Sequence, residues 1–222
     1  MSKYYEAYDD RYKAAHEKGL HWFSSTQTPI LSSVIKKYDI TTQNKLLELG
    51  CGEGRDAQHL LLNGFSLLAT DISPEAILYC KKTWPEYEKS FQIIDCINNK
   101  LAEKFDFIYA VAVVHMLLLD ADRDAFYRFI YNHLENDGLA LICSMGDGNT
   151  ERQSDISTAF ELQERECEGQ TVFVTGTSCR MVNNETFANE LKRNHLSIVE
   201  KGQTSIPNEF TDMMYVVVKK KI

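Results

Sequence analysis

One short stretch constrains the fold of this chain more than any other, the sequence LLELGCGEGRD at residues 46–56. Its three glycines, Gly50, Gly52 and Gly54, follow an apolar run and stand just before a run with helical spacing. Glycine admits left-handed backbone conformations and lets a ligand lie against the main chain. The free N–H groups at the start of the next helix then point towards that ligand. We therefore expect a strand, a tight turn and a helix, with a small molecule bound at the turn.

The same alternation of strands and helices continues along the chain. Apolar runs typical of buried strands occur at 45–50, 66–72, 90–96, 105–113 and 138–145, with amphipathic stretches between them. Two more strands, at 197–206 and 213–221, are joined by a loop too short for a crossover helix, so they should run antiparallel. The pattern predicts an α/β fold with a parallel sheet that becomes mixed at one edge.

Several helix ends are visible in the sequence. Ser73 and Pro74 suit the cap and first turn of a helix that reaches residue 84, and Gly64 closes the helix that begins near Arg55. Asn184 is expected to cap a helix over 184–196. A further amphipathic helix is predicted at 120–134, before a turn at 136–138, and a helix and a strand within 155–182.

Acidic residues close the first three predicted strands: Glu48, Asp71 and Asp95. The carboxyl ends of parallel strands meet at the ligand-binding edge of such a sheet. A pyrophosphate would meet like charge there, whereas a sulfonium with an ammonium group would be attracted. A dinucleotide turn would also need its third glycine at the position of Arg55. These features favour a cationic nucleoside over a nicotinamide dinucleotide, with Asp71 near two ribose hydroxyls and Asp95 near an adenine amino group.

LLELGCGEGRD, followed by ATDIS and IIDC, resembles the class I S-adenosylmethionine-dependent methyltransferase family. The resemblance is close over residues 44–145, and within the family it is nearest to the small-molecule branch of tellurite-resistance and thiopurine-type enzymes. It implies a Rossmann-like, doubly wound sheet of seven strands with the last antiparallel. It also implies that S-adenosylmethionine, with S-adenosylhomocysteine as product, contacts a set of residues along the strand ends: Glu48, Gly50, Cys51, Gly52, Gly54, Asp71, Ile72, Asp95, Cys96 and Ala110.

Methyl transfer is an in-line displacement that needs positioning more than a dedicated nucleophile. His115, just after the fourth strand, is the candidate general base; the alternative is a histidine that only packs there. Tyr12 and Trp22, with Phe23, could form an aromatic lid over the acceptor, or Tyr12 could pack a helix on the sheet. Arg180 could pair with an anionic acceptor or remain solvated. The histidine spacings indicate no metal site.

Length and charge limit the remaining possibilities. The 222 residues predict one domain, divided into an N-terminal helical lid or substrate segment (1–44), a cofactor-binding core (45–145) and a substrate-side insertion (146–182). A net charge of −8 without a basic stripe disfavours nucleic acid, and no apolar run is long enough to span a membrane. We expect a cytoplasmic monomer or homodimer that methylates a small molecule. The alternatives are a non-catalytic cofactor-binding interaction module and, less favoured, a nicotinamide-dependent oxidoreductase.

Overall fold

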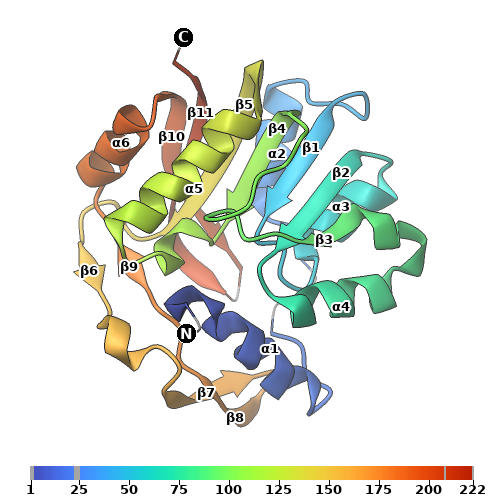
Figure 1. Cartoon of the computed structure of the whole chain (residues 1–222), viewed down its shortest axis with the longest axis vertical. Helices are drawn as coiled ribbons and strands as arrows, with labels where there is room; N and C mark the ends of the chain where they lie inside the picture. The colour runs from blue at the N-terminus through green and yellow to red at the C-terminus, as the bar shows by residue number, and fades with distance from the viewer. Residues whose placement is uncertain (1–2, 23–25, 208, 222) are drawn as a thin grey trace.

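The computed structural model describes residues 3–22, 26–207 and 209–221, and a seven-stranded sheet forms its centre (Figure 1). The strand order is β10-β11-β5-β4-β1-β2-β3. Strands β1 to β5 pair in parallel, while β11 runs antiparallel to both β5 and β10. The predicted seven-stranded sheet with an antiparallel last strand is therefore confirmed. The strands are β1 (Lys45–Leu49), β2 (Ser66–Asp71), β3 (Phe91–Ile93), β4 (Phe105–Val111), β5 (Leu134–Met145), β10 (Leu196–Ile206) and β11 (Phe210–Lys220).

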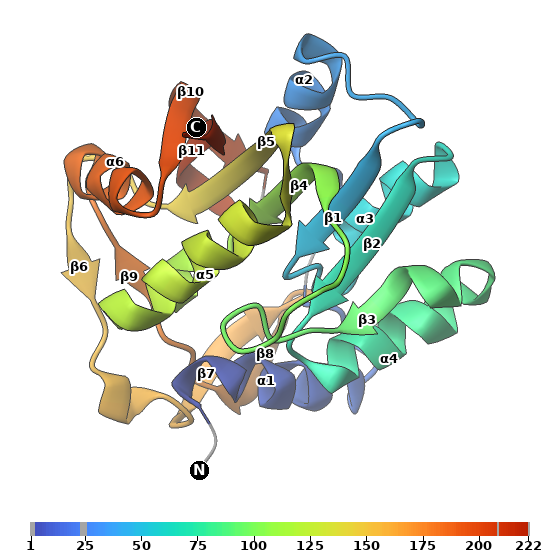
Figure 2. The same ribbon diagram turned by 45° about the horizontal axis from the view of Figure 1, so that its top comes forward.

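Helices cover both faces of this sheet (Figure 2). One apolar cluster joins alternate strand residues to α2 (Pro29–Lys37), α3 (Arg55–Leu62) and α4 (Pro74–Thr83). The opposite cluster joins the other strand residues to α5 (Asp120–His133) and α6 (Asn184–Arg193). Because successive strand side chains point to opposite faces, a central strand such as β4 is buried along almost its whole length. The six cysteines are free thiols, and no helix among the described residues is long and apolar enough to cross a membrane.

Local sequence signals account for most of the helix ends. The Ser73 hydroxyl accepts a hydrogen bond from Ala76 N, as a cap for α4 should, and Gly64 follows α3 with a φ of +78°. The prediction for α6 is one residue late, because Asn183 rather than Asn184 accepts the capping bond from Thr186 N. The predicted turn at 136–138 is instead an irregular part of β5, which shows a register shift against β4.

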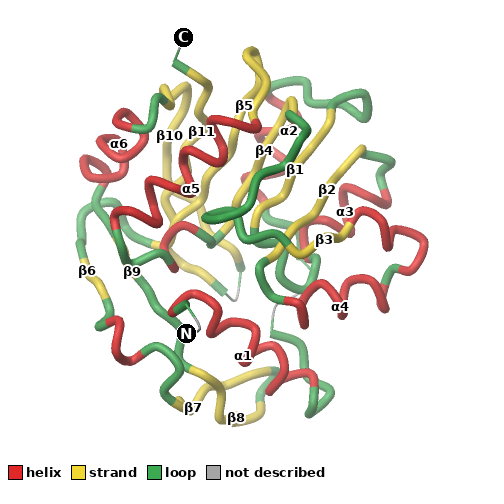
Figure 3. The backbone as a smooth tube through the Cα atoms, in the orientation of Figure 1, coloured by secondary structure: helices red, strands yellow, loops and turns green. Residues whose placement is uncertain are grey.

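The segment between β5 and α6 consists mostly of loops with short strands (Figure 3). It contains the pair β6 (Arg152–Gln153) with β9 (Arg180–Met181), a short 3₁₀ turn at 156–158, and the hairpin of β7 (Leu162–Cys167) with β8 (Gln170–Thr175). The strand expected here is present, but the helix expected within 155–182 is not. Glu168 and Gly169 both have positive φ, the conformation of a two-residue hairpin turn, and this turn favours a second strand over a helix.

The N-terminal helix lies across the carboxyl edge of the sheet. A 3₁₀ turn (Tyr4–Glu6) leads into α1 (Ala7–His16), which runs beside α4 and packs on β8 (Figures 1 and 2). In Figure 1, α1 lies between the strand ends and the β7–β8 hairpin. The N-terminal segment and the segment after β5 therefore meet beyond the edge where ligands bind in open α/β sheets.

Candidate active site

The glycine turn after β1 has the left-handed backbone conformation that its glycines allow. Gly50, Gly52 and Gly54 have φ values of +73°, +53° and +77°, which side chains rarely adopt. The N–H groups of Gly50 and Cys51 both donate to Thr70 O, at 2.7 and 2.9 Å, and this holds the turn against β2. A Cβ atom at Gly50 would lie 2.4 Å from Cγ2 of Val113, so the residues that follow β4 leave no room for a side chain. The turn therefore depends on glycine for both its conformation and its packing.

A cavity of about 1010 Å³, including the solvent space at its mouth, opens beside this turn. The ends of β1, β2, β3 and β4 form its floor. Its lining is mostly apolar, with tyrosines and carboxylates among the aliphatic side chains. The lining residues are Tyr5, Tyr8, Tyr12, Glu48, Leu49, Gly50, Cys51, Gly52, Arg55, Asp56, Thr70, Asp71, Ile72, Ile94, Asp95, Cys96, Ile97, Val111, Ala112, Val113, Met116, Leu117 and Phe210.

Glu48 is the most unusual group in this lining. Its side chain is 3% exposed, and its Oε2 atom makes no hydrogen bond of normal geometry. Burial, reinforced by the charge of Asp56, raises the pKa of Glu48 well above its ordinary value. The Tyr109 hydroxyl lies nearby and opposes this rise in the pKa of Glu48, but it too is buried without a hydrogen-bond partner. A buried acceptor without a donor is costly, so this oxygen suits a donor or a cation supplied by a ligand.

Asp71 has a structural role in addition to the predicted ligand role. Its Oδ2 atom accepts from Gly52 N at 2.8 Å, and its Oδ1 atom accepts from Ser73 N at 2.9 Å. Burial raises the pKa of Asp71, although these backbone bonds oppose the shift. Asp71 thus braces the glycine turn and the start of α4 while it faces the cavity.

Asp95 is covered by the N-terminal segment. Lys3 Nζ lies 2.5 Å from its Oδ2 atom, and Ile97 N and the Asn98 side chain donate to the same carboxylate. Burial alone would raise the pKa of Asp95, but the hydrogen bonds from Lys3 and Asn98 lower it overall. The neighbouring Cys96 also lines the cavity. Burial raises the pKa of its thiol to about 12, so the thiol stays uncharged and packs as an apolar group.

The tyrosines of the N-terminal segment face the cavity. Tyr5, Tyr8 and Tyr12 all line it, and Tyr12 is 3% exposed. Burial raises the pKa of the Tyr12 hydroxyl well above its ordinary value, so the group stays protonated at neutral pH. Of the two interpretations of Tyr12, the geometry favours a cover for the cavity over a helix packed on a sheet face.

Five of the predicted site residues do not line the cavity. Gly54 ends the turn under Trp84, and Ala110 lies inside β4, in the core; the residues that reach the cavity from this strand end are Val111, Ala112 and Val113. The other three are His115, Trp22 and Arg180. Their positions follow from partners in distant segments, and Phe23 lies outside the described residues.

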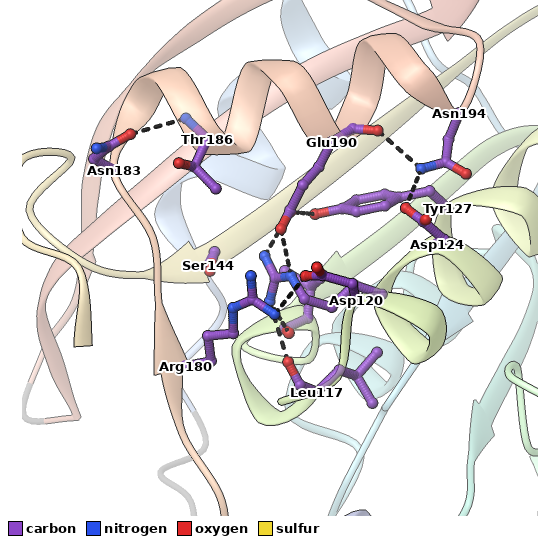
Figure 4. A network of polar contacts seen from close by, with 12 residues as sticks. Leu117, Asp120, Asp124, Tyr127, Ser144, Arg180, Asn183, Thr186, Glu190 and Asn194 are labelled. Atoms are coloured by element: carbon purple, nitrogen blue, oxygen red, sulfur yellow. Dashed lines mark hydrogen bonds and ion pairs between the residues drawn. The ribbon is translucent and has the colours of Figure 1, made fainter. Parts of the chain in front are cut away.

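His115 sits in a 3₁₀ turn (Val114–Met116), where it is 3% exposed and packs edge-on against Phe210. Burial, together with the charge of Arg123, lowers the pKa of His115 to about 4. Trp22 N donates to the Glu53 carboxylate, and the Trp22 ring lies 4.8 Å from the Arg11 guanidinium. Arg180 pairs with Asp120 (Figure 4) and donates to Leu118 O, so its charge already has a partner within the protein.

A buried ion pair that was not predicted from the sequence supports the part of the cavity lining formed by Met116 and Leu117. Arg123 and Glu190 are both fully buried, joined by two hydrogen bonds of 2.7 and 2.6 Å, and Tyr127 donates to the same carboxylate (Figure 4). Arg123 also donates to Val114 O at 2.7 Å. The sequence contains a signal for it, since Arg123 shares helical spacing with the apolar face of Phe126 and Ile130.

Comparison with known proteins gives consistent matches. Residues 47–140 match the family model described as a methyltransferase domain. A malonyl-[acyl-carrier protein] O-methyltransferase of Bacillus anthracis is 24% identical over 199 residues, 89% of this chain and 66% of that protein. The probable S-adenosyl-L-methionine-dependent methyltransferase TehB of Haemophilus influenzae is 30% identical over 99 residues, 43% of this chain and 34% of that protein. The chain thus spans just under two thirds of the first relative's length and about a third of the second's.

A solved structure shares the fold over nearly the whole chain. The Burkholderia thailandensis 1,6-didemethyltoxoflavin-N1-methyltransferase, with bound 1,6-didemethyltoxoflavin and S-adenosylhomocysteine, superposes with a TM-score of 0.68 at 16% identity. The match covers 95% of this chain and 85% of that one. At this level of identity the similarity is one of fold.

Proposed function

Since the chain belongs to the class I S-adenosylmethionine-dependent methyltransferase family, we propose that it transfers a methyl group from S-adenosylmethionine to a small-molecule acceptor. The family was predicted from the glycine turn and the strand-end acids, and this prediction is confirmed, as is the cofactor of the family. The identity of the acceptor and the roles of individual residues belong to the proposal.

The buried Oε2 atom of Glu48, without a partner beside a turn that admits no side chain, carries the proposal. This pairing suits a ligand that brings its own N–H donors and positive charge, as the methionine end of S-adenosylmethionine does. Asp71 would hold the ribose hydroxyls through the lone pairs that its two backbone bonds leave free. The apolar side chains of Ile72 and Cys96, with Asp95 beside them, would receive the adenine.

When bound, S-adenosylmethionine supplies a methyl group activated by its sulfonium charge. The protein would contribute alignment and exclusion of water, for which effective molarities indicate at most about 7 to 11 kcal/mol. The glycine turn and Asp71 fix one end of the site, and the tyrosines of the N-terminal segment cover it. His115 is poorly suited to remove a proton, because its low pKa makes it a weak base and it does not line the cavity.

The proposed methyl acceptor is a small molecule. The Burkholderia thailandensis enzyme, which shares this fold, binds a compound of that kind, 1,6-didemethyltoxoflavin, together with S-adenosylhomocysteine. In this chain Met116 and Phe210 form apolar parts of the lining at the end of β4 and the start of β11. An apolar, largely covered cavity fits a compact acceptor better than a polymer.

Calorimetry with S-adenosylhomocysteine and with NAD tests the cofactor part of the proposal. We expect heat only with S-adenosylhomocysteine; binding of NAD instead would favour an oxidoreductase. Radiolabelled S-adenosylmethionine with a panel of thiols, amines and hydroxyl compounds tests transfer itself. A protein that binds the cofactor yet labels no member of a broad panel would support the non-catalytic interaction module.

The Asp71→Ala variant tests the site. It should weaken S-adenosylhomocysteine binding severalfold, and it should also cost about 1–3 kcal/mol of stability, because Gly52 N and Ser73 N lose their acceptor. Asp155→Ala is the matched control, since Asp155 also accepts a backbone N–H but caps the short turn at 156–158, outside the cavity lining. Equal affinity in both folded variants would exclude the ribose role of Asp71.

A further inference from the structure

Two histidines and a glutamate come together beside the glycine turn. His16 is the last residue of α1, His21 follows in the next loop, and Glu53 stands between Gly52 and Gly54. One ligand atom from each of the three lies within 4.8 Å of the other two. The distance between His16 Nε2 and Glu53 Oε1 is 2.8 Å. None of these three side chains lines the cavity assigned to the cofactor.

Second interactions hold two of these side chains in place. His16 Nδ1 lies 2.8 Å from Glu75 Oε1, and the ring of Tyr79 stacks on the His16 ring at 4.8 Å. Trp22 N donates to both carboxylate oxygens of Glu53, at 2.9 and 2.8 Å. A carboxylate behind an imidazole is the usual support of a metal-binding histidine, because it fixes the ring and makes the ligating nitrogen more basic.

We propose that His16, His21 and Glu53 bind one divalent transition-metal ion, with zinc as the best match. Two imidazoles and one carboxylate form a ligand set that zinc accepts, with a fourth position open to water. Imidazole also suits nickel and copper, whereas magnesium prefers oxygen ligands alone. Zinc ligands at about 2.0–2.2 Å lie roughly 3.3 Å from one another, so small side-chain movements would complete the site.

This site is hard to predict from the sequence. His16 and His21 are not spaced as ligands on one helix face, and Glu53 is supplied by a distant part of the chain. The fold joins them because α1 crosses the carboxyl edge of the sheet next to α4. A metal here would tie the N-terminal segment directly to the turn that builds the cofactor cavity.

Protonation of His16 is the alternative explanation for this arrangement. A protonated His16 would donate to both Glu53 and Glu75 and would satisfy the same two distances. His21 separates the two cases, because its exposed ring takes part in the metal site and in neither of those hydrogen bonds. The His21→Ala variant should therefore remove metal binding and leave the His16 hydrogen bonds unchanged.

The test uses untagged full-length protein dialysed against a chelator. Calorimetry with zinc chloride, metal content after gel filtration, and the melting temperature with and without zinc are the measurements, and magnesium chloride is the comparison ion. We expect one zinc per chain, a higher melting temperature with zinc, and no response to magnesium. His21→Ala should weaken zinc binding at least about tenfold, and Glu75→Ala by about 10–100-fold.

His195→Ala is the matched control, because His195 is another exposed histidine and lies just beyond the C-terminal end of α6. It should bind zinc as the unchanged protein does. Circular dichroism establishes that each variant is folded. The absence of zinc uptake by the unchanged protein, or equal uptake by His21→Ala and His195→Ala, would overturn the metal site and leave His16 as a member of an ion pair.

Discussion

Lys3 Nζ lies 2.5 Å from Asp95 Oδ2, a contact that joins the first described residue to the end of the third strand. It is one of several anchors of the N-terminal segment. The Tyr4 hydroxyl donates to Asp122 and accepts from Leu118 N, and Asp9 accepts from Ser73 Oγ. These contacts reach both sides of the cavity, and we predict that some of them open when a ligand enters or leaves.

Lys3→Met should therefore change ligand exchange more than stability. The lysine side chain is 40% exposed, so the ion pair is worth at most about 1 kcal/mol. We expect S-adenosylhomocysteine to dissociate severalfold faster in stopped-flow experiments, with little change in the free energy of unfolding. Lys13→Met is the control, because Lys13 also pairs with an aspartate, Asp9, but that pair lies within α1 and contains no residue of the cavity lining. If the two variants release the ligand at the same rate, the Lys3 contact does not gate the cavity.

Glu48→Gln should make the ligand-free protein less sensitive to alkaline pH. The pKa of Glu48 is raised in the folded state, so between its ordinary value of 4.5 and that raised value the folded protein binds more protons than the unfolded chain. Stability contributed by the protonated form is thus lost as the pH rises. Urea unfolding at pH 5 and pH 8 should show a larger loss for the unchanged protein than for Glu48→Gln.

The same substitution should weaken binding of S-adenosylhomocysteine, because a carboxamide cannot ionise, whereas the Glu48 carboxyl can lose its proton and then pair with the ammonium group of the ligand. A variant whose stability depends less on pH but which binds the ligand more weakly would identify Glu48 as a group kept for binding. A variant that binds as tightly as the unchanged protein would show that the free Glu48 oxygen does not face the ligand.

The central part of the fold could be predicted because its signals are local. The strand before Gly50, the glycine turn and the helix after it are consecutive in the chain, and so are the residues that set their conformation. Asp71 and Asp95 could be placed near Glu48 for a related reason: neighbouring parallel strands bring their ends to one edge. Local pattern and sheet topology were sufficient for this half of the site.

The remainder of the site depends on contacts between distant segments. Trp22 and Arg180 were expected near the acceptor, but Glu53 holds the backbone of the first and Asp120 pairs with the second. The hairpin at 162–175 was missed because β7 is mostly exposed and carries almost no apolar pattern. The partners of charged side chains and of exposed strands cannot be predicted from the local sequence pattern, because they come from distant parts of the chain.

His115→Gln should remove an acid-sensitive contribution to stability. The pKa of His115 is lowered from 6.5 to about 4 in the folded protein, so in that interval the unfolded chain binds more protons. Stability contributed by the neutral imidazole is present above pH 6.5 and is lost as the pH falls towards 4. Urea unfolding at pH 5 and pH 7 should show a smaller loss in the variant than in the unchanged protein.

The same variant tests catalysis by His115. A general base with a pKa near neutrality would give a methyl-transfer rate that rises between pH 6 and 8, and its removal would abolish that rise. With a pKa of about 4, His115 is already neutral there, so the unchanged protein and His115→Gln should have parallel pH–rate profiles. If the rate rises between pH 6 and 8 in the unchanged protein but not in the variant, His115 acts as the general base.

Gly50→Ala should be far more damaging than the same change at Gly169. Both glycines have nearly the same φ, +73° and +74°, so the left-handed conformation costs both variants about 1–2 kcal/mol. A Cβ atom at Gly169 meets nothing within 4 Å, whereas at Gly50 it would lie 2.4 Å from Val113. The clash adds about 1–3 kcal/mol and forces the turn away from Val113, so affinity for S-adenosylhomocysteine should also fall. Urea unfolding and calorimetry of the pair measure both effects, and equal losses of stability would mean that the turn tolerates a side chain.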